Sequence, residues 1–262
     1  MWRLMRFAIV LLFCLAYCGC GGPRDDLAVS SQKASDFFAS PVSLALAEAA
    51  ARGNIAEMTQ LLKDGGEVDS PGRFGVTAAW WAVRTKSKNG FSFLLSRGAN
   101  PNPDVDTITI LEMAAGYEDS GFLETALSYR PAINRVGRST GDAPIDTAIT
   151  QNRTRNLELL IKARADLDIQ AGSGGLPILQ AIYAGRYDYV HMLLLAGANP
   201  DKVIAGGKVS LVNQISRRYV DPDSDAFVWR ERVIRFLRSK GIEAHPPANE
   251  GKRTKPLPAD LR

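Results

Sequence analysis

Short apolar blocks alternate with polar turns along most of the chain, and small residues are concentrated in the first half of each block. Apolar residues spaced three and four apart predict helices. Each block is long enough for two short helices joined by a turn. The first helix of each block is expected at LALAEAAARGN (44–54), TAAWWAVRT (77–85), TILEMAAGY (109–117), APIDTAITQ (143–151) and LPILQAIYAGR (176–186).

The second half of each block ends in a common motif with an apolar pair and a turn. The five copies are LLKDGGEVD (61–69), LLSRGANPN (94–102), ALSYRPAIN (126–134), LIKARADLD (160–168) and LLLAGANPD (193–201). Their glycine position is held by Gly65, Gly98, Arg130, Arg164 and Gly197, at spacings of 33, 32, 34 and 33. A fixed period of this length indicates a solenoid of repeats. Glycine there would end the second helix in the left-handed region, which other residues enter at a cost of about 1 kcal/mol. We therefore expect weaker helix ends at the two arginines.

These blocks resemble the ankyrin repeat, whose pattern is a Thr-Pro-Leu-His-like helix start, Ala-Ala, Gly, then Leu-Leu and Gly-Ala-Asp/Asn. Ala49-Ala50 and Ala114-Ala115 would let neighbouring repeats stack closely. Thr77, Thr109 and Pro177 lie where helices prefer to start. The resemblance implies an all-α, ankyrin-repeat solenoid of about five repeats, over roughly residues 40 to 243.

A sixth, divergent unit is expected to close the array as a C-terminal capping repeat. Its helices are predicted at LVNQISRRY (211–219) and WRERVIRFLRSKG (229–241), with the Arg230-Glu231-Arg232 run on a solvated face. Gly241 follows Gly197 by 44 residues, so about ten residues are inserted, and Asp221–Asp225 is the expected place. Terminal repeats are atypical because one face meets solvent. We therefore predict a repeat domain at 41–243, followed by a disordered, Pro-rich basic tail at 244–262.

The N-terminus has the form of an export signal. A short segment with Arg3 and Arg6 precedes an apolar run, Phe7 to Tyr17, that is too short to span a bilayer comfortably. The following Cys18-Gly19-Cys20 resembles the bacterial lipobox, in which a cysteine after small residues becomes lipidated. Small Gly19 precedes Cys20 whereas bulky Tyr17 precedes Cys18, so Cys20 is favoured and Cys18 is the alternative. An ordinary cleaved signal or an anchor helix would be the other interpretations.

This interpretation divides the N-terminus into a lipoprotein signal peptide (1–19) and a lipidated cysteine with a flexible linker (20–40). The protein would then be lipid-anchored in the cell envelope and face the periplasm. Gly21, rather than Asp, would follow the lipidated cysteine, which favours the outer membrane. The three cysteines, Cys14, Cys18 and Cys20, all lie in this segment, so the folded body has no thiol for a disulfide or a metal.

The rest of the chain offers little catalytic equipment. Gly137 to Gly141 matches G-x-S-x-G in letters, but that motif needs a strand and a histidine partner, and the histidines are His191 and His245. Asp104 and Asp106 give too few oxygen ligands for calcium. The formal net charge of +4 is not gathered into a basic cluster on one predicted helix, which argues against nucleic acid. We expect no enzymatic activity, no cofactor and no metal.

Ankyrin-type proteins bind protein partners through their turn tips and the concave end of their first helices. The same register implies partner-binding positions here, and Phe74, Arg84, Tyr117 and Tyr183 rank first because hot spots favour aromatic residues and arginine. At least one of Trp80 and Trp81 is expected to be packed. The unbound protein is expected to be monomeric. The predicted partner-binding residues are Arg73, Phe74, Arg84, Asp106, Tyr117, Asp142, Gln151, Tyr183 and Arg218.

A lipid anchor joined to a binding fold without catalysis suggests two functions. One is an immunity or inhibitor protein that neutralises a toxic effector in the periplasm, for example a type VI secretion phospholipase. The alternative is a periplasmic scaffold for a resident envelope or stress-defence enzyme. The strongly diverged repeats favour the first, because they suit a single dedicated partner.

Overall fold

The computed structural model describes residues 32–171, 175–202, 209–248, 251 and 253–261. The predicted signal peptide, Cys18 and Cys20 lie outside the described residues. The chain divides into two compact units between Ala163 and Arg164, where the sequence predicts one repeat domain over 41–243. Each unit is described by itself below.

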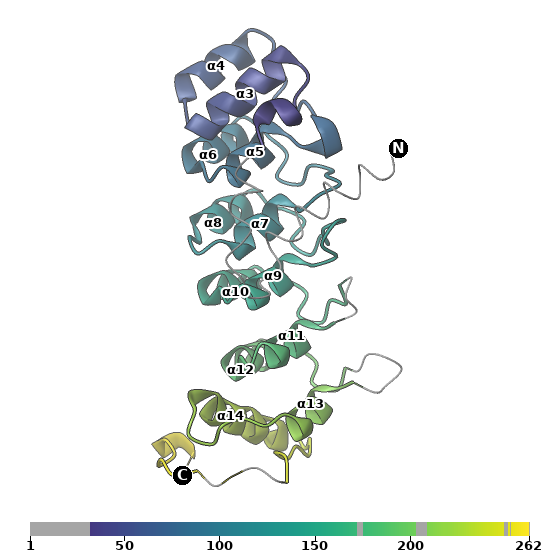
Figure 1. The fold of residues 1–262 in the computed structure, drawn as a ribbon, viewed down its shortest axis with the longest axis vertical. Helices are drawn as coiled ribbons and strands as arrows, with labels where there is room; N and C mark the ends of the chain where they lie inside the picture. Colours follow the sequence, from purple (N-terminus) through teal and green to yellow (C-terminus); the bar gives the residue numbers. More distant parts are fainter. Residues whose placement is uncertain (1–31, 172–174, 203–208, 249–250, 252, 262) are drawn as a thin grey trace. The chain divides into compact units, whose positions relative to one another are not determined.

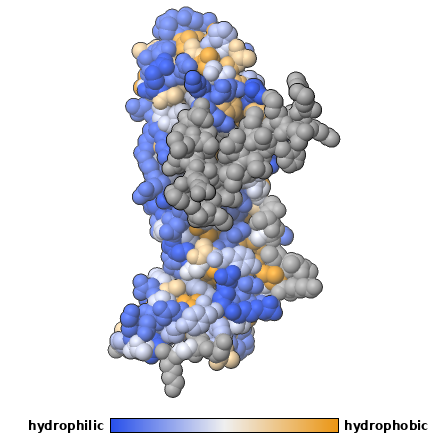
Figure 2. Space-filling view, viewed as in Figure 1, coloured by the Kyte–Doolittle hydropathy of each residue, from blue (hydrophilic) through white to orange (hydrophobic). Residues whose placement is uncertain are grey.

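Unit 1 consists of helix pairs joined by short connections (Figure 1). A 3-10 turn, η1 (Ala34–Asp36), precedes them. The pairs in the described part of unit 1 are α3 (Pro41–Arg52) with α4 (Ile55–Lys63), α5 (Ala78–Arg84) with α6 (Lys88–Ser96), α7 (Ile110–Gly116) with α8 (Gly121–Ser128), and α9 (Pro144–Thr150) with α10 (Thr154–Lys162). The even-numbered helices form an outer row, whose visible edge in Figure 2 is mostly hydrophilic.

Unit 2 is also made of helix pairs, and its last helix is longer than the others. Its described helices are α11 (Pro177–Tyr183), α12 (Tyr187–Leu195), α13 (Leu211–Arg217) and α14 (Asp225–Ser239), followed by η3 (Ala259–Leu261). Both units are helical repeats of the ankyrin type, which confirms the predicted fold class. No helix in the described part of the chain has both the length and the apolar character that crossing a membrane requires.

The insertion in the last pair is placed differently from the prediction. The α13–α14 connection covers 218–224 where the α11–α12 connection covers only 184–186, and α14 has 15 residues where α12 has nine. The extra residues are thus shared between a longer connection and a longer helix. Helix α14 begins at Asp225 because the Ser224 hydroxyl accepts a hydrogen bond from the Phe227 N–H, at 3.2 Å.

The predicted helix boundaries are confirmed where capping residues set them. The Thr77 hydroxyl accepts from the Trp80 N–H at 3.3 Å, the Thr109 hydroxyl accepts from the Glu112 N–H at 3.1 Å, and Pro177 is the first residue of α11. At the other end of the repeat, the predicted left-handed position is also confirmed. The φ angles there are 94° at Gly65, 90° at Gly98, 50° at Arg130, 64° at Arg164 and 101° at Gly197.

The core of unit 1 is built from small residues and a tryptophan pair. Ala49, Ala50, Ala114 and Ala115 are fully buried on the first helices, as stacking of the repeats requires. Both tryptophans are packed: Trp80 is fully buried and its indole N–H donates to the Ile108 carbonyl at 2.8 Å, and Trp81 is 6% exposed. The tryptophan rings lie 6.4 Å apart, centroid to centroid.

Residues that the sequence places in a flexible linker contribute to this core. Phe37 and Phe38 are buried at 3% and 2% exposure, and the Phe37 ring lies 5.4 Å from that of Trp81. The described part of the predicted linker (32–40) therefore covers the tryptophan pair. An aromatic pair in this segment has apolar surface to bury, and burying that surface favours packing over free motion.

A ladder of side-chain to backbone hydrogen bonds joins successive repeats within each unit. The last residue of one motif accepts from a backbone N–H two residues before the end of the next motif. Asp69 accepts from Asn100 at 2.9 and 3.0 Å, Asn102 accepts from Ala132 at 2.7 Å, and Asp168 accepts from Asn199 at 3.0 and 3.2 Å. This gives Asp69, Asn102 and Asp168 a role in holding neighbouring repeats in register.

Two features of unit 2 differ from the sequence-based expectation. Arg230, expected on a solvated face, is fully buried and its guanidinium lies 4.8 Å from the centre of the Phe227 ring.

The sequence predicts a disordered segment at 244–262, but the described part of this segment lies against the last helix pair. Asp260 pairs with Arg232 at 2.9 Å, and Leu261 is buried. Charged pairs and a few apolar residues fix this segment despite its proline content.

Candidate protein-binding surfaces

The turns that precede the first helices form one edge of unit 1, called here the tip edge and made up of Arg73, Phe74, Asp104, Asp106 and Arg138. The Arg73 N–H donates to the Phe37 carbonyl at 2.8 Å, and the Asp106 N–H donates to the Phe74 carbonyl at 2.9 Å. Phe74 has a left-handed backbone, with φ of 61°. The structure thus brings together three predicted partner-binding residues, Arg73, Phe74 and Asp106, on hydrogen-bonded turns.

The charges of the tip edge are paired with one another. Arg138 lies 2.9 Å from Asp106 and 2.8 Å from Asp104, and Arg135 lies 2.6 Å from Asp104. These contacts raise the pKa of Arg138 through its hydrogen bond to Asp106 and the nearby Asp104. Asp106 is exposed as predicted, but it is already engaged by Arg138.

Beneath the tips lies a cluster of buried carboxyls around the turn at 137–142. Burial raises the pKa of Glu112 to about 8 and that of Asp146 to about 7, while the hydroxyl of Thr140 donates to Glu112. Burial also raises the pKa of Asp142, a predicted partner-binding residue that is half-buried. Asp142 therefore belongs partly to the interior.

The ends of the first helices hold the remaining predictions for unit 1. Arg84 closes α5 and Gln151 caps α9, and both are half-buried. Tyr117 is 8% exposed, so the prediction of an exposed contact is wrong. Its hydroxyl donates to the Val83 carbonyl at 2.9 Å and its ring meets Phe122 edge-on at 5.5 Å.

In unit 2 the structure brings together Tyr183 and Arg218. Tyr183 ends α11 and is 43% exposed, and the Arg218 guanidinium lies 4.8 Å from the centre of its ring. An exposed tyrosine held against an arginine combines the two residue types that dominate binding hot spots. Among the predicted residues of unit 2, this pair is the best-formed candidate.

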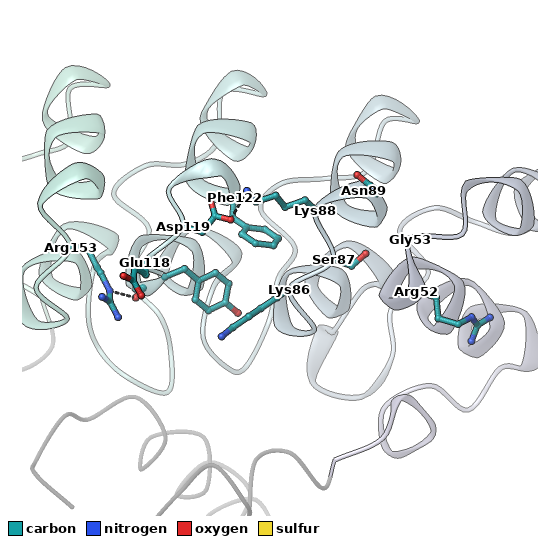
Figure 3. Close-up of a pocket in the computed structure, with 12 residues that line it drawn as sticks. Arg52, Gly53, Lys86, Ser87, Lys88, Asn89, Glu118, Asp119, Phe122 and Arg153 are labelled. Atoms are coloured by element: carbon teal, nitrogen blue, oxygen red, sulfur yellow. Dashed lines mark hydrogen bonds and ion pairs between the residues drawn. The ribbon is translucent and has the colours of Figure 1, made fainter. Parts of the chain in front are cut away.

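A surface that the sequence singles out only through Tyr117 lies on the opposite end of the helices in unit 1. This connection groove has a volume of about 630 Å³ and is lined by the turns that follow α3, α5, α7 and α9 (Figure 3). The volume falls within the range of about 300–1,000 Å³ typical of ligand pockets. Its charged lining residues are Arg52, Lys86, Lys88, Glu118, Asp119 and Arg153.

A sequence signal for part of this groove does exist. When the connections are aligned, Lys86 and Asn152 take the place of Gly53 and Gly185. All four have left-handed backbones, with φ of 59°, 59°, 65° and 70°. A residue other than glycine at such a position has a strained backbone, and strain of this kind is found most often at functional sites. The remaining lining residues depend on how the repeats stack, which no single repeat reveals.

Within the described residues, no group of three or more His, Cys, Asp or Glu side chains is arranged to hold a metal ion. Burial raises the pKa values of Glu112, Asp142 and Asp146, which lie close together around the turn at 137–142. We assign these carboxyls no ligand.

Comparison with known proteins agrees with this geometry. A family model described as ankyrin repeats (many copies) matches residues 145–194, from the second residue of α9 to the next-to-last residue of α12. Together with the helix pairs of both units, this match supports ankyrin repeats in this part of the chain. It is also similar to the human transient receptor potential cation channel subfamily A member 1, with 28% identity over 155 residues. The aligned region covers 57% of this chain and 14% of that protein, so it gives no information on the activity of the whole channel subunit.

Proposed function

We propose that the chain is a non-enzymatic, protein-binding lipoprotein of the bacterial envelope that neutralises a toxic effector in the periplasm, such as a type VI secretion phospholipase. Ankyrin-repeat domains are typically non-enzymatic modules that bind other proteins. The envelope location is supported by the lipobox-like Cys18-Gly19-Cys20, with Cys20 as the lipidated residue. The immunity role is supported by the combination of anchor, binding fold and diverged repeats.

One observation carries the binding function: the tip edge is held in place by its own contacts. Backbone hydrogen bonds link Phe37 to Arg73 and Phe74 to Asp106, and ion pairs link Arg138 to two aspartates. A surface fixed before binding loses less conformational entropy when a partner docks. Arg73, which is exposed there, is the residue most directly offered to a partner.

The proposal is tested by capture and by competition. Residues 21–262 should retain the product of the neighbouring effector gene on a column, and Arg73→Glu with Tyr183→Ala should weaken that complex at least tenfold. The exposed outer-helix change Lys162→Glu serves as the control and should not weaken it. A strain that lacks this gene should be killed by a sibling that delivers the effector. Undiminished fitness in that contest, with capture of a resident envelope enzyme, would support the scaffold alternative instead.

A further inference from the structure

The connection groove of unit 1 contains more cations than anions, and its cations differ in how they are engaged. Lys88 forms an ion pair with Asp119. Arg52 pairs with Glu57 at 2.9 Å and with Glu48 at 3.9 Å. In contrast, Lys86 and Arg153 make no ion pair with any described residue. The positive charge that remains available in the groove therefore lies at these two side chains.

Lys86 is held in position by an aromatic support. Its ammonium lies 5.3 Å from the centre of the Tyr117 ring, and that ring is fixed by the hydrogen bond of its hydroxyl to Val83. Lys86 also has a left-handed backbone, where the equivalent positions of two other connections are glycines. A lysine there costs backbone energy that glycine would avoid. Strain of this kind at an exposed charged residue points to a use for its side chain.

Within the described part of the chain, a single hydrogen bond anchors the Arg153 guanidinium. Its Nε donates to the Gly116 carbonyl at 2.8 Å, at the end of α7. This contact satisfies a helix-end carbonyl and orients the guanidinium. The terminal N–H groups of an arginine can then form charge-assisted hydrogen bonds with a carboxylate. In Figure 3 the side chains of Lys86 and Arg153 reach toward the same side of the groove.

From this arrangement we propose that the connection groove is a second partner-binding site, which takes an acidic peptide segment with Lys86 and Arg153 as its carboxylate ligands. The proposal rests on the protein-binding function above and adds the chemistry of the partner. Glu118 and Asp119 also line the groove. Their negative charge beside the two cations disfavours a dense polyanion such as nucleic acid, but a peptide can space its carboxylates to avoid it.

Fluorescein-labelled hexaglutamate, with hexaglutamine as the matched neutral peptide, tests the site on the full-length chain by fluorescence anisotropy at about 0.15 M salt. Lys86→Gly is the decisive variant because it removes the ammonium and relieves the left-handed strain. It should weaken hexaglutamate binding about tenfold while the melting temperature rises. Arg153→Gln should weaken binding to a similar extent. A purely structural role for Lys86 would leave binding unchanged.

The control replaces two exposed outer-helix cations, Lys63→Gln with Lys162→Gln, which removes one charge more than either groove variant but away from the groove. Equal weakening by this pair would show non-specific attraction and overturn the proposal. So would unchanged binding in Lys86→Gly, or displacement of the peptide by inorganic phosphate at equal ionic strength. If the wild-type chain captures its partner but Lys86→Gly captures it equally well, the groove proposal fails and the proposed function stands.

Discussion

At the tip edge of unit 1, Arg135 and Arg138 are paired with Asp104 and Asp106, whereas in the connection groove Lys86 and Arg153 make no ion pair with a described residue. The two edges lie at opposite ends of the same helices. At the tips, paired charges hold the turns and leave Arg73 and Phe74 as the contact residues. In the groove, Lys86 keeps a positive charge available although its left-handed backbone is strained. The comparison shows that charge count alone does not identify a binding edge.

The largest expected effect comes from charging the carboxyls beneath the tip edge. Glu112 and Asp146 have folded-state pKa values of about 8 and about 7, above their ordinary values of 4.5 and 3.8. Between the ordinary and raised values the folded state binds more protons than the unfolded state. The stability that these two carboxyls contribute is therefore fully present below about pH 4 and is lost as the pH rises through 7 and 8. From pH 5 to pH 9, urea unfolding should show a loss in the free energy of unfolding on the order of 6 kcal/mol.

Glu112→Gln is the matched control for this pH dependence. The amide cannot ionise, so the variant should retain only the part of the pH dependence that Asp146 contributes. A wild-type and a variant curve with the same slope between pH 7 and pH 9 would contradict the assignment to Glu112.

Next in size is the effect of adding a methyl group where backbones approach closely. A Cβ at Gly75, next to Phe74 of the tip edge, would lie 1.9 Å from the Asp104 carbonyl oxygen, and Gly75 has φ of 74°. A Cβ at Gly90, at the start of α6, would lie 2.0 Å from the Ala50 carbonyl oxygen. Gly75→Ala should cost about 3 kcal/mol and Gly90→Ala about 2 kcal/mol in denaturant unfolding. Gly98→Ala, with no atom within 4 Å of the added carbon, should cost only about 1 kcal/mol. Equal costs at the three positions would show that the close contacts relax.

A smaller, stabilising effect is expected where arginine stands at a glycine position. Arg130 has φ of 50°, so Arg130→Gly should increase the free energy of unfolding by about 1 kcal/mol. The reverse change, Gly98→Arg, should lower it by a similar amount. If Arg130→Gly destabilises the protein, the arginine side chain makes a contact that outweighs its backbone strain.

The smallest effect is expected from the exposed ion pairs of the tip edge. Arg138→Ala removes contacts to Asp104 and Asp106, but exposed pairs contribute little to folding stability. The melting temperature should hardly change. Hydrogen exchange of the Asp106 amide, which donates to Phe74, should report any local loosening. A large fall in melting temperature would mean that these ion pairs stabilise the whole folded unit and not only the local turns.

The repeats were predictable because a 33-residue period, capping residues and a recurring glycine position each constrain the backbone locally. Thr77, Thr109 and Arg130 behave as their local sequence indicates. Tyr117 does not, because its burial depends on Phe122, which the next helix supplies. Trp81 is covered by Phe37 from a segment that no repeat pattern describes. The burial of Tyr117 and Trp81 thus depends on contacts between different elements. The residue spacing within one motif does not predict such contacts.

The hydrogen-bond ladder has a consequence for how such a chain can change its length. Each rung joins the final Asp or Asn of one motif to a backbone N–H of the next, and a backbone N–H is the same whatever residue carries it. Removing residues 70–102 as a block would bring Asp69 to the Ala132 N–H that Asn102 now contacts. At this ladder, one repeat can therefore replace another, and gene duplication or loss could change the number of repeats without changing these hydrogen bonds.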